Sequence, residues 1–128
     1  MDNLTILQRP ELREPYCVAA FAGWPNAADV ATRAVIHLRD RLGAARLAEI
    51  EPEEFYDFST LRPLVAIKDG IMEGLQLPTN EFFFWRNPAA DHDLIFFLGT
   101  EPHLRWGTYI DIVLHVAQAW RATALFAL

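Results

Sequence analysis

The amino-acid sequence predicts an α/β fold, because two apolar runs each lead through a glycine toward a helical pattern. Residues Tyr16–Ala22 form a continuous apolar run that stops at Gly23, and Leu94–Leu98 form a second run that stops at Gly99. Continuous apolar runs of this length are typical of strands that are covered on both faces. The segment after each glycine spaces its apolar residues as a helix does. Strand, turn and helix in this order are the unit from which α/β domains are built.

The segment before the first predicted strand, residues 1–15, mixes polar residues with two prolines. We expect it to form an N-terminal arm or an edge segment, ahead of a single domain that spans residues 16–128. After the strand, Gly23–Pro25 is the predicted turn. Asn26 can cap the first helix, and Gly43 can end it.

Short strands and an acidic loop are predicted in the middle of the chain. The predicted strands are Ala44–Ile50, Leu64–Ile67, Ile71–Leu77 and Glu81–Arg86. Asp69-Gly70 is typical of a hairpin turn between the second and third of these. The loop Glu51–Phe58 combines four carboxylates with three aromatic rings. It is either a solvated turn whose rings pack back onto the core or part of a site.

The last third of the chain predicts a second helix and a final strand. Pro102 suits the first turn of that helix, whose apolar stripe runs to Trp120. We expect Ala122–Leu128 to be a third buried strand. A buried parallel strand needs neighbours on both sides. The chain is therefore the front part of a longer protein, or the strand lies at an edge or pairs with another subunit.

Composition excludes several classes of function. The 128 residues fit one domain, and a net charge of −6 with Lys68 as the only lysine argues against a nucleic-acid surface. Cys17, the only cysteine, is expected to be a small buried hydrophobic residue and not a nucleophile. No apolar run approaches the roughly 20 residues that a membrane helix needs, and the N-terminus has no signal pattern. We expect a cytoplasmic protein.

No complete catalytic, metal-binding or nucleotide-binding motif is present. Neither glycine turn matches GxGxxG or GxxxxGK[ST], and the histidines lack metal-ligand spacing. Ser59, the only serine, has no nucleophile-elbow context. We therefore predict no catalytic residue, no metal and no cofactor.

The candidate site is a rim at the carboxyl ends of the strands, where open α/β sheets usually bind ligands. Glu101 and Arg105 either form an ion pair on the helix surface, or Arg105 holds the loop Glu51–Asp57 by a charge-assisted hydrogen bond. Arg62 is a second candidate for that role, and His103 lies beside the pair. The predicted rim consists of Gly23, Trp24, Asn26, Glu54, Tyr56, Asp57, Arg62, Glu101 and Arg105.

Four stretches resemble the PAC2 family, the proteasome assembly chaperone 2-like proteins. They begin at Phe21, Glu51 (with Arg62-Pro63), Pro78 and Gly99, and read FAGWPNAA, EPEEFYDF, PTNEF and GTEPHLRW. The resemblance implies a three-layer α/β/α fold of the phosphorylase/hydrolase-like kind that assembles into homo-oligomers. Eukaryotic and archaeal members of the family bind proteasome α-subunits, some through a C-terminal tail with a tyrosine.

This chain departs from the family pattern in three places. Ala127 stands where the docking tail has tyrosine, so tail docking is not expected. Asn26 and Ala28 stand where aspartate and glycine are expected. Family members also continue past the last predicted strand, so the chain is expected to be the N-terminal part of the family domain, truncated at its C-terminus.

Three functions remain open from the sequence. The leading hypothesis is a non-enzymatic oligomeric scaffold or assembly-chaperone-like module that binds protein. The alternative is a small-molecule or nucleotide-binding enzyme, such as a carboxylate-amine ligase, that uses the rim. The third is a structural fragment without activity of its own.

Overall fold

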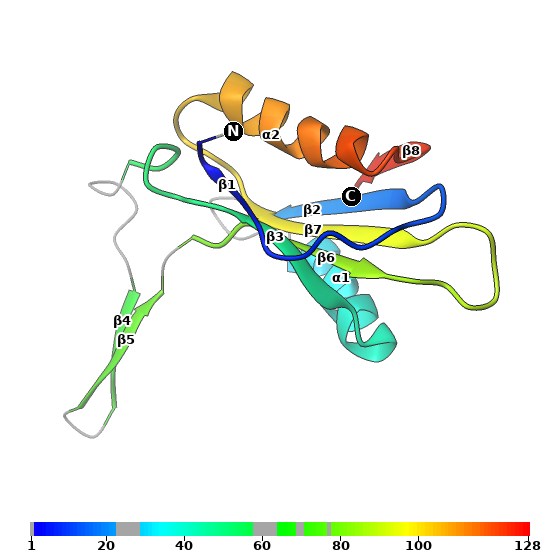
Figure 1. The fold of residues 1–128 in the computed structure, drawn as a ribbon. Helices are drawn as coiled ribbons and strands as arrows, with labels where there is room; N and C mark the ends of the chain where they lie inside the picture. Colours follow the sequence, from blue (N-terminus) through cyan, green and yellow to red (C-terminus); the bar gives the residue numbers. More distant parts are fainter. Residues whose placement is uncertain (1, 23–28, 58–63, 69–70, 77) are drawn as a thin grey trace.

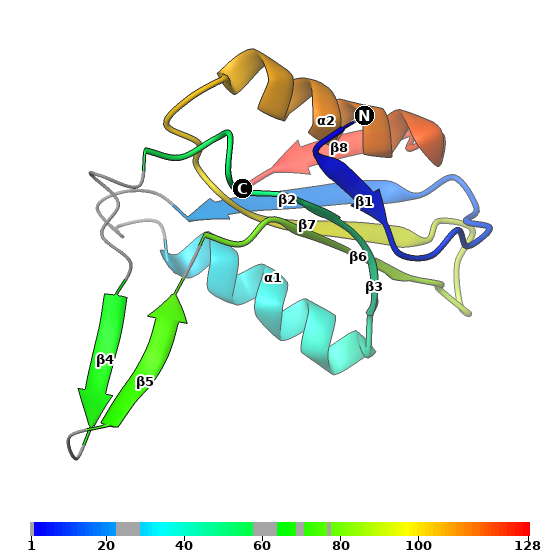
Figure 2. The ribbon, with the colours of Figure 1, turned by 60° about the vertical axis from the view of Figure 1, so that its left-hand side comes forward.

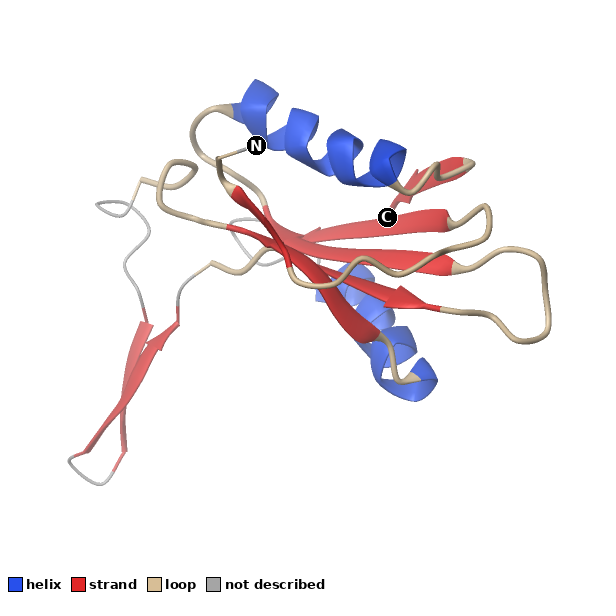
Figure 3. Cartoon of the chain, viewed as in Figure 1, coloured by secondary structure: helices blue, strands red, loops and turns tan. Residues whose placement is uncertain are grey.

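The structure is a computed structural model that describes residues 2–22, 29–57, 64–68, 71–76 and 78–128. A six-stranded sheet in the order β1-β3-β6-β7-β2-β8 forms its centre (Figures 1 and 3). Its strands are β1 Leu4–Ile6, β2 Tyr16–Ala22, β3 Ala45–Ile50, β6 Glu81–Trp85, β7 Leu94–Thr100 and β8 Ala124–Ala127. The predicted turn at Gly23–Pro25, the hairpin turn Asp69-Gly70, and the residues Asn26 and Arg62 lie outside the described residues.

One helix covers each face of the sheet, so the predicted three-layer α/β fold is confirmed. Helix α1 (Asp29–Leu42) lies on one face and α2 (Trp106–Ala119) on the other, as Figures 1 and 2 show. Strand β2 runs parallel to both of its neighbours, β7 and β8, and the pairs β7–β6, β6–β3 and β3–β1 are antiparallel. The apolar run of β2 is thus explained by cover on both faces.

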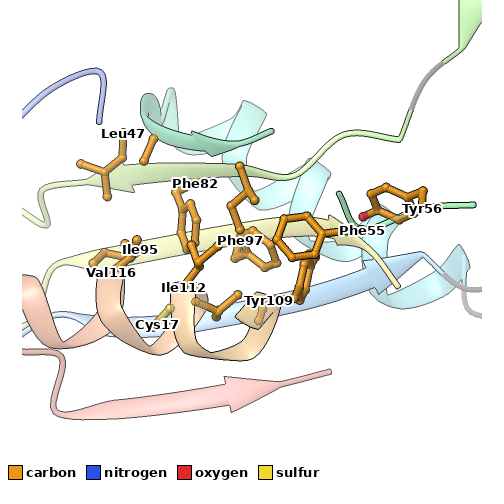
Figure 4. Packing of buried hydrophobic residues seen from close by; sticks show 14 residues of the cluster. Cys17, Leu47, Phe55, Tyr56, Phe82, Ile95, Phe97, Tyr109, Ile112 and Val116 are labelled. Atoms are coloured by element: carbon orange, nitrogen blue, oxygen red, sulfur yellow. The ribbon is translucent and has the colours of Figure 1, made fainter. Parts of the chain in front are cut away.

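The core under α2 is larger than the core under α1. Figure 4 shows rings and aliphatic side chains from the sheet meeting those of α2. Under α1 the fully buried residues are Ala20, Val35, Phe83 and Phe96. Neighbouring residues of β6 alternate between the two cores, because successive strand residues point to opposite faces. Cys17 is fully buried, and burial raises the pKa of its thiol to about 12, which confirms it as a small buried hydrophobic residue.

The ends of the two helices differ in how well the sequence predicts them. Helix α1 ends at Leu42, and Gly43 takes a left-handed φ of 66°, which confirms the predicted stop. Helix α2 begins at Trp106, so the prediction that Pro102 lies in its first turn was wrong. Pro102 is buried in the loop before the helix, and Arg105 occupies the N-cap position with a left-handed φ of 55°.

Gly99 lies inside β7 and not in a turn after it, which corrects the prediction. The Phe97 ring and the Tyr109 hydroxyl occupy the space that a side chain would need, within 2.5 Å of the position of an added Cβ. The glycine therefore allows β7 and α2 to approach closely at this point.

Among the described residues, the final strand, β8, lies at the edge of the sheet and pairs with β2 alone. Its prediction as a third buried strand was wrong, because Leu125 and Phe126 are exposed.

The first segment of the chain forms the other edge of the sheet. Strand β1 pairs antiparallel with β3, and the Trp120 indole N–H donates to the Pro10 carbonyl at 2.8 Å. Residues 1–15 thus include an edge strand, one of the two predicted alternatives.

Strands β4 (Leu64–Lys68) and β5 (Ile71–Gln76) form a separate antiparallel hairpin, close to the predicted bounds. In Figures 1 and 2 this hairpin projects away from the six-stranded sheet.

Candidate functional site

Two loops meet at the carboxyl ends of β3 and β7 and form the described part of the rim. The first is Glu51–Asp57, and the second is Glu101–Arg105. Backbone hydrogen bonds join them, because the N–H groups of His103 and Leu104 both donate to the Phe55 carbonyl, at 2.8 and 3.0 Å. The sheet therefore presents one continuous rim here and not two independent loops.

Arg105 holds the acidic loop through Glu54. Its Nη1 lies 2.5 Å from Glu54 Oε2, and the Asn3 side-chain amide donates to the same oxygen at 2.9 Å. In the described residues Arg105 thus pairs with Glu54 and not with Glu101, which decides between the two predicted alternatives. Both side chains of this pair are about half exposed, so it adds at most about 1 kcal/mol to stability.

Beneath this ion pair lies a buried polar group that we call the rim cluster: Tyr56, Asn80, Thr100 and Tyr109. Asn80 Oδ1 accepts from the Tyr109 hydroxyl at 2.6 Å and from the Thr100 N–H at 3.0 Å. The Asn80 amide donates to the Tyr56 hydroxyl at 2.9 Å, which in turn donates to the Thr100 carbonyl at 2.6 Å. One asparagine thus ties the acidic loop, β7 and α2 together.

Burial keeps both tyrosines of the rim cluster neutral. It raises the pKa of Tyr56, against the opposing effect of its hydrogen bonds to Asn80 and Tyr109. Burial also raises the pKa of Tyr109, and the nearby Tyr56 and Glu101 add to that shift. No buried side-chain nitrogen or oxygen lacks a hydrogen-bond partner in the part of the chain that the structure describes. The polar atoms of the rim cluster are therefore bonded within the protein, and they hold the acidic loop, β7 and α2 together.

The other predicted rim residues that the structure describes lie around the rim cluster. The Asp57 N–H donates to His103 Nδ1 at 3.2 Å, and the His103 ring packs edge-on against Tyr56. The Glu101 side chain is exposed, while its backbone N–H donates to the Ala22 carbonyl at 2.9 Å. Gly23, Trp24, Asn26 and Arg62 lie outside the described residues.

A cavity of about 260 Å³ adjoins the Glu54–Arg105 pair. It is lined by Asp2, Asn3, Glu54, Arg105, Thr108 and Ile112. Carboxylates and a guanidinium in one cavity suit a small ligand that carries both charges.

Asn80 and Tyr109 are the central residues of the rim that the sequence did not single out. Tyr109 belongs to the apolar stripe of α2 and is typical of a core residue. Asn80 stands directly before the aromatic strand β6, inside the PTNEF stretch that resembles the PAC2 family, and that stretch was the signal that could have found it.

A second polar group, centred on the buried Asp93, lies at the opposite end of the sheet. We call it the base cluster: the exposed Arg13, the half-buried Asn87 and the buried Asp93. Asp93 accepts from the backbone N–H groups of Arg13 and Asn87, each at 2.7 Å, and the Arg13 guanidinium lies 3.5 Å from it. Burial alone would raise the pKa of Asp93, but these donors and the guanidinium together lower it.

Neither a metal site nor a membrane helix is found in the described part of the chain. No three or more His, Cys, Asp or Glu side chains among those residues are grouped to hold a metal ion. The two described helices are too short or too polar to span a bilayer.

Together, the sheet with one helix on each face and the rim at its strand ends define an α/β protein of three layers. The profile of the PAC2 family matches residues 20–128. The chain belongs to the PAC2 family.

Solved structures of family members agree with this assignment. A proteasome-assembly chaperone homologue from Mycobacterium tuberculosis has 35% identity and a TM-score of 0.74, over 88% of this chain and 48% of that one. A PAC2 family protein from Streptomyces avermitilis has 30% identity and a TM-score of 0.73 over the same shares. The chain thus spans about half the length of these relatives. A Mycobacterium tuberculosis protein of unknown function, at 22% identity and a TM-score of 0.84, shares the fold over 98% of this chain and 44% of its own. No curated protein matches the chain.

Proposed function

We propose that the chain is a non-enzymatic protein-binding module, which acts as an oligomeric scaffold or an assembly chaperone. The observation that carries this proposal is the β4–β5 hairpin. Its two strands pack chiefly against each other, and the hairpin projects from the sheet (Figure 2). A two-stranded hairpin alone is marginally stable in water, so a partner protein would stabilise it.

The sequence of the hairpin is suited to contact with protein. It reads LVAIK in β4 and IMEGLQ in β5, with one charged residue in each strand. A contiguous apolar patch on a protein often marks a site of contact with another protein.

The construction of the rim supports a binding role over a catalytic one. Asn80, Tyr56 and Tyr109 bind one another, and Arg105 binds Glu54. General acid–base catalysis needs a group that reaches the substrate with a pKa near the working pH. Raised tyrosine pKa values move these hydroxyls away from that range.

The name of one relative suggests the class of partner. The Mycobacterium tuberculosis homologue is described as a proteasome-assembly chaperone homologue. We therefore propose proteasome subunits as the first partners to test, together with further copies of this chain.

The test is a pull-down with purified proteasome α- and β-subunits from the organism that encodes the chain. We expect the immobilised chain to retain them, and retention to be lost when residues 64–76 are replaced by a short Gly-Ser linker. The matched control is Arg105→Ala, which leaves the hairpin intact and should retain the subunits. Equal retention by the linker variant would contradict the role of the hairpin, and no retention by the unaltered chain would exclude this partner.

The cavity beside Arg105 supports a second candidate, a small-molecule or nucleotide-binding protein that uses the rim. A thermal-shift series with ATP plus Mg²⁺ and with small amino acids tests it. This candidate requires a rise in Tm that Arg105→Ala removes and Arg46→Ala does not. Arg46 is a matched control because it is also exposed and paired with glutamates, Glu49 and Glu81.

A further inference from the structure

Two segments from distant parts of the sequence enclose a cavity at the end of the sheet where the base cluster lies. One is the arm at residues 11–13, and the other is the loop at residues 86–93, which connects β6 to β7. The two segments lie side by side in Figures 1 and 2. The cavity, which we call the base cavity, measures about 540 Å³, a volume typical of small-molecule sites.

Hydrogen bonds hold the two walls of the base cavity against each other. The Arg13 guanidinium donates to the carbonyl oxygens of Asn87 and Ala90, at 2.6 and 3.0 Å. The Asp93 N–H donates to the Arg13 carbonyl at 3.0 Å, and the Tyr16 N–H donates to the Asp93 carbonyl at 2.9 Å. A cavity whose walls are fixed before the ligand arrives loses less conformational entropy on binding.

Four charged side chains line the base cavity, and two of them compensate each other. The Arg13 guanidinium lies 3.5 Å from the buried Asp93 carboxylate. Glu11 and Arg86 are the other two, and both are exposed. Neither forms a hydrogen bond or an ion pair with any residue that the structure describes. The cavity therefore offers one unpaired carboxylate and one unpaired guanidinium.

We propose that the base cavity binds a small zwitterion of the amino-acid type, whose carboxylate pairs with Arg86 and whose ammonium pairs with Glu11. A guanidinium binds a carboxylate through two parallel N–H···O bonds, and a carboxylate accepts from an ammonium group. A ligand with one charge of each sign leaves neither side chain unpaired. Leu12, which is half-buried, also lines the cavity and favours a ligand with an apolar side chain, such as leucine.

The base cavity is separate from the last strand and from the rim. In the strand order, β7 and β2 lie between β6 and β8, and the described residues that line the cavity include none from β8 or α2. The cavity beside Arg105 is less suited to a zwitterion, because its guanidinium is already paired with Glu54.

The test is a titration of the isotope-labelled full chain with leucine, followed by two-dimensional NMR. We expect saturating shifts of the amide signals at residues 11–13 and 86–93, with a Kd of about 1 mM because both charged groups are exposed. Isocaproate, which is leucine without its ammonium, and isoamylamine, which is leucine without its carboxylate, should each bind at least about 5-fold more weakly.

Single variants assign each charge of the ligand to one side chain. Arg86→Ala should weaken leucine at least about 5-fold and leave isoamylamine unchanged, whereas Glu11→Gln should weaken leucine equally and leave isocaproate unchanged. The matched control is Arg41→Ala on α1, another exposed arginine without a partner among the described residues, which should bind leucine as the unaltered chain does. Well-dispersed spectra of the variants check that the fold is retained.

Three results would overturn the proposal. They are no saturating shift with leucine, phenylalanine or the dipeptide Leu-Leu, unchanged leucine binding in Arg86→Ala, and shifts at the rim that Arg105→Ala removes. The last of these would assign the ligand to the cavity beside Arg105 instead. None of the three affects the protein-binding module, because partner binding is measured separately in the pull-down.

Discussion

The two ends of the sheet are each closed by one buried polar side chain, and the two side chains differ in charge. Asn80 is 2% exposed at the rim, and Asp93 is 1% exposed at the base. The neutral amide of Asn80 forms hydrogen bonds with two tyrosine hydroxyls and one backbone N–H. The carboxylate of Asp93 accepts hydrogen bonds from two backbone N–H groups and lies beside a guanidinium. A carboxylate can be buried where a cation and N–H donors compensate it, and an amide needs only hydrogen bonds.

This difference has consequences for stability against pH. The base cluster depends on an ionised group whose folded pKa is lowered, and the rim cluster depends on tyrosines whose folded pKa values are raised. The contribution of the base cluster to the free energy of unfolding should therefore fall in acid, and that of the rim cluster should fall in alkali. Both contributions should be complete at neutral pH.

The largest effect is expected from Asn80→Ala, which removes the centre of the rim cluster. The Tyr109 hydroxyl and the Thr100 N–H would lose their acceptor in a buried site, which should lower the free energy of unfolding by about 3 kcal/mol. Urea unfolding measures this loss. Thr79→Ala, the exposed neighbour, is the matched control and should change stability by less than about 0.5 kcal/mol. A loss for Asn80→Ala as small as the control's would show that the rim does not depend on its amide.

Gly99→Ala tests how closely β7 and α2 approach beside the rim cluster. The new methyl group would lie within 2.5 Å of the Phe97 ring and the Tyr109 hydroxyl, so we expect a loss of about 2 kcal/mol from overpacking. Gly107→Ala, where no atom lies within 4 Å of the added group, should be neutral or stabilising by roughly 0.5 kcal/mol. Thermal unfolding of both variants compares them, and equal Tm values would count against the close approach.

Asp93→Asn should cost about 1.5 kcal/mol at neutral pH, since the new amide group turns a donor toward a backbone N–H. The stabilisation from the lowered pKa of Asp93 is complete above the unfolded pKa of about 3.9 and is lost as the pH falls through it toward the folded pKa. Unfolding measured from neutral to acid pH should thus show a smaller decline for the variant than for the unaltered chain. Parallel curves would mean that Asp93 does not carry the acid sensitivity.

The same reasoning predicts the opposite behaviour at the rim. The raised pKa values of Tyr56 and Tyr109 stabilise the fold below the unfolded tyrosine pKa of about 10, and this contribution is lost as the pH rises above it. In Tyr109→Phe the alkaline decline should be smaller. Spectrophotometric titration of the tyrosines in the folded chain provides the check, and tyrosines that all ionise as free tyrosine does would contradict it.

The smallest effect is expected from Arg105→Ala. Its pair with Glu54 is half exposed, so the loss should stay below about 1 kcal/mol and shrink further in high salt. Chemical denaturation at low and high salt measures it. A loss as large as that of Asn80→Ala would mean that the surface pair, and not the buried amide, holds the rim.

The sequence by itself predicted the elements whose signal is local. The apolar run of β2, the hairpin β4–β5 and the glycine that ends α1 all follow from neighbouring residues, since periodicity and turn chemistry act within a few positions. The pairing of Arg105 with the acidic loop was one of two alternatives, and the structure chose between them.

Only the tertiary structure decided the strand order, the edge position of β8, the start of α2 and the contacts of Gly99. The same holds for the rim cluster, where Asn80 meets Tyr56 and Tyr109 from 24 and 29 residues away along the chain. From the sequence alone, an asparagine is equally suited to a turn, to a helix cap or to the centre of a buried hydrogen-bond network. Its role is set by which hydroxyls and N–H groups the fold brings within hydrogen-bonding distance, and that depends on long-range packing.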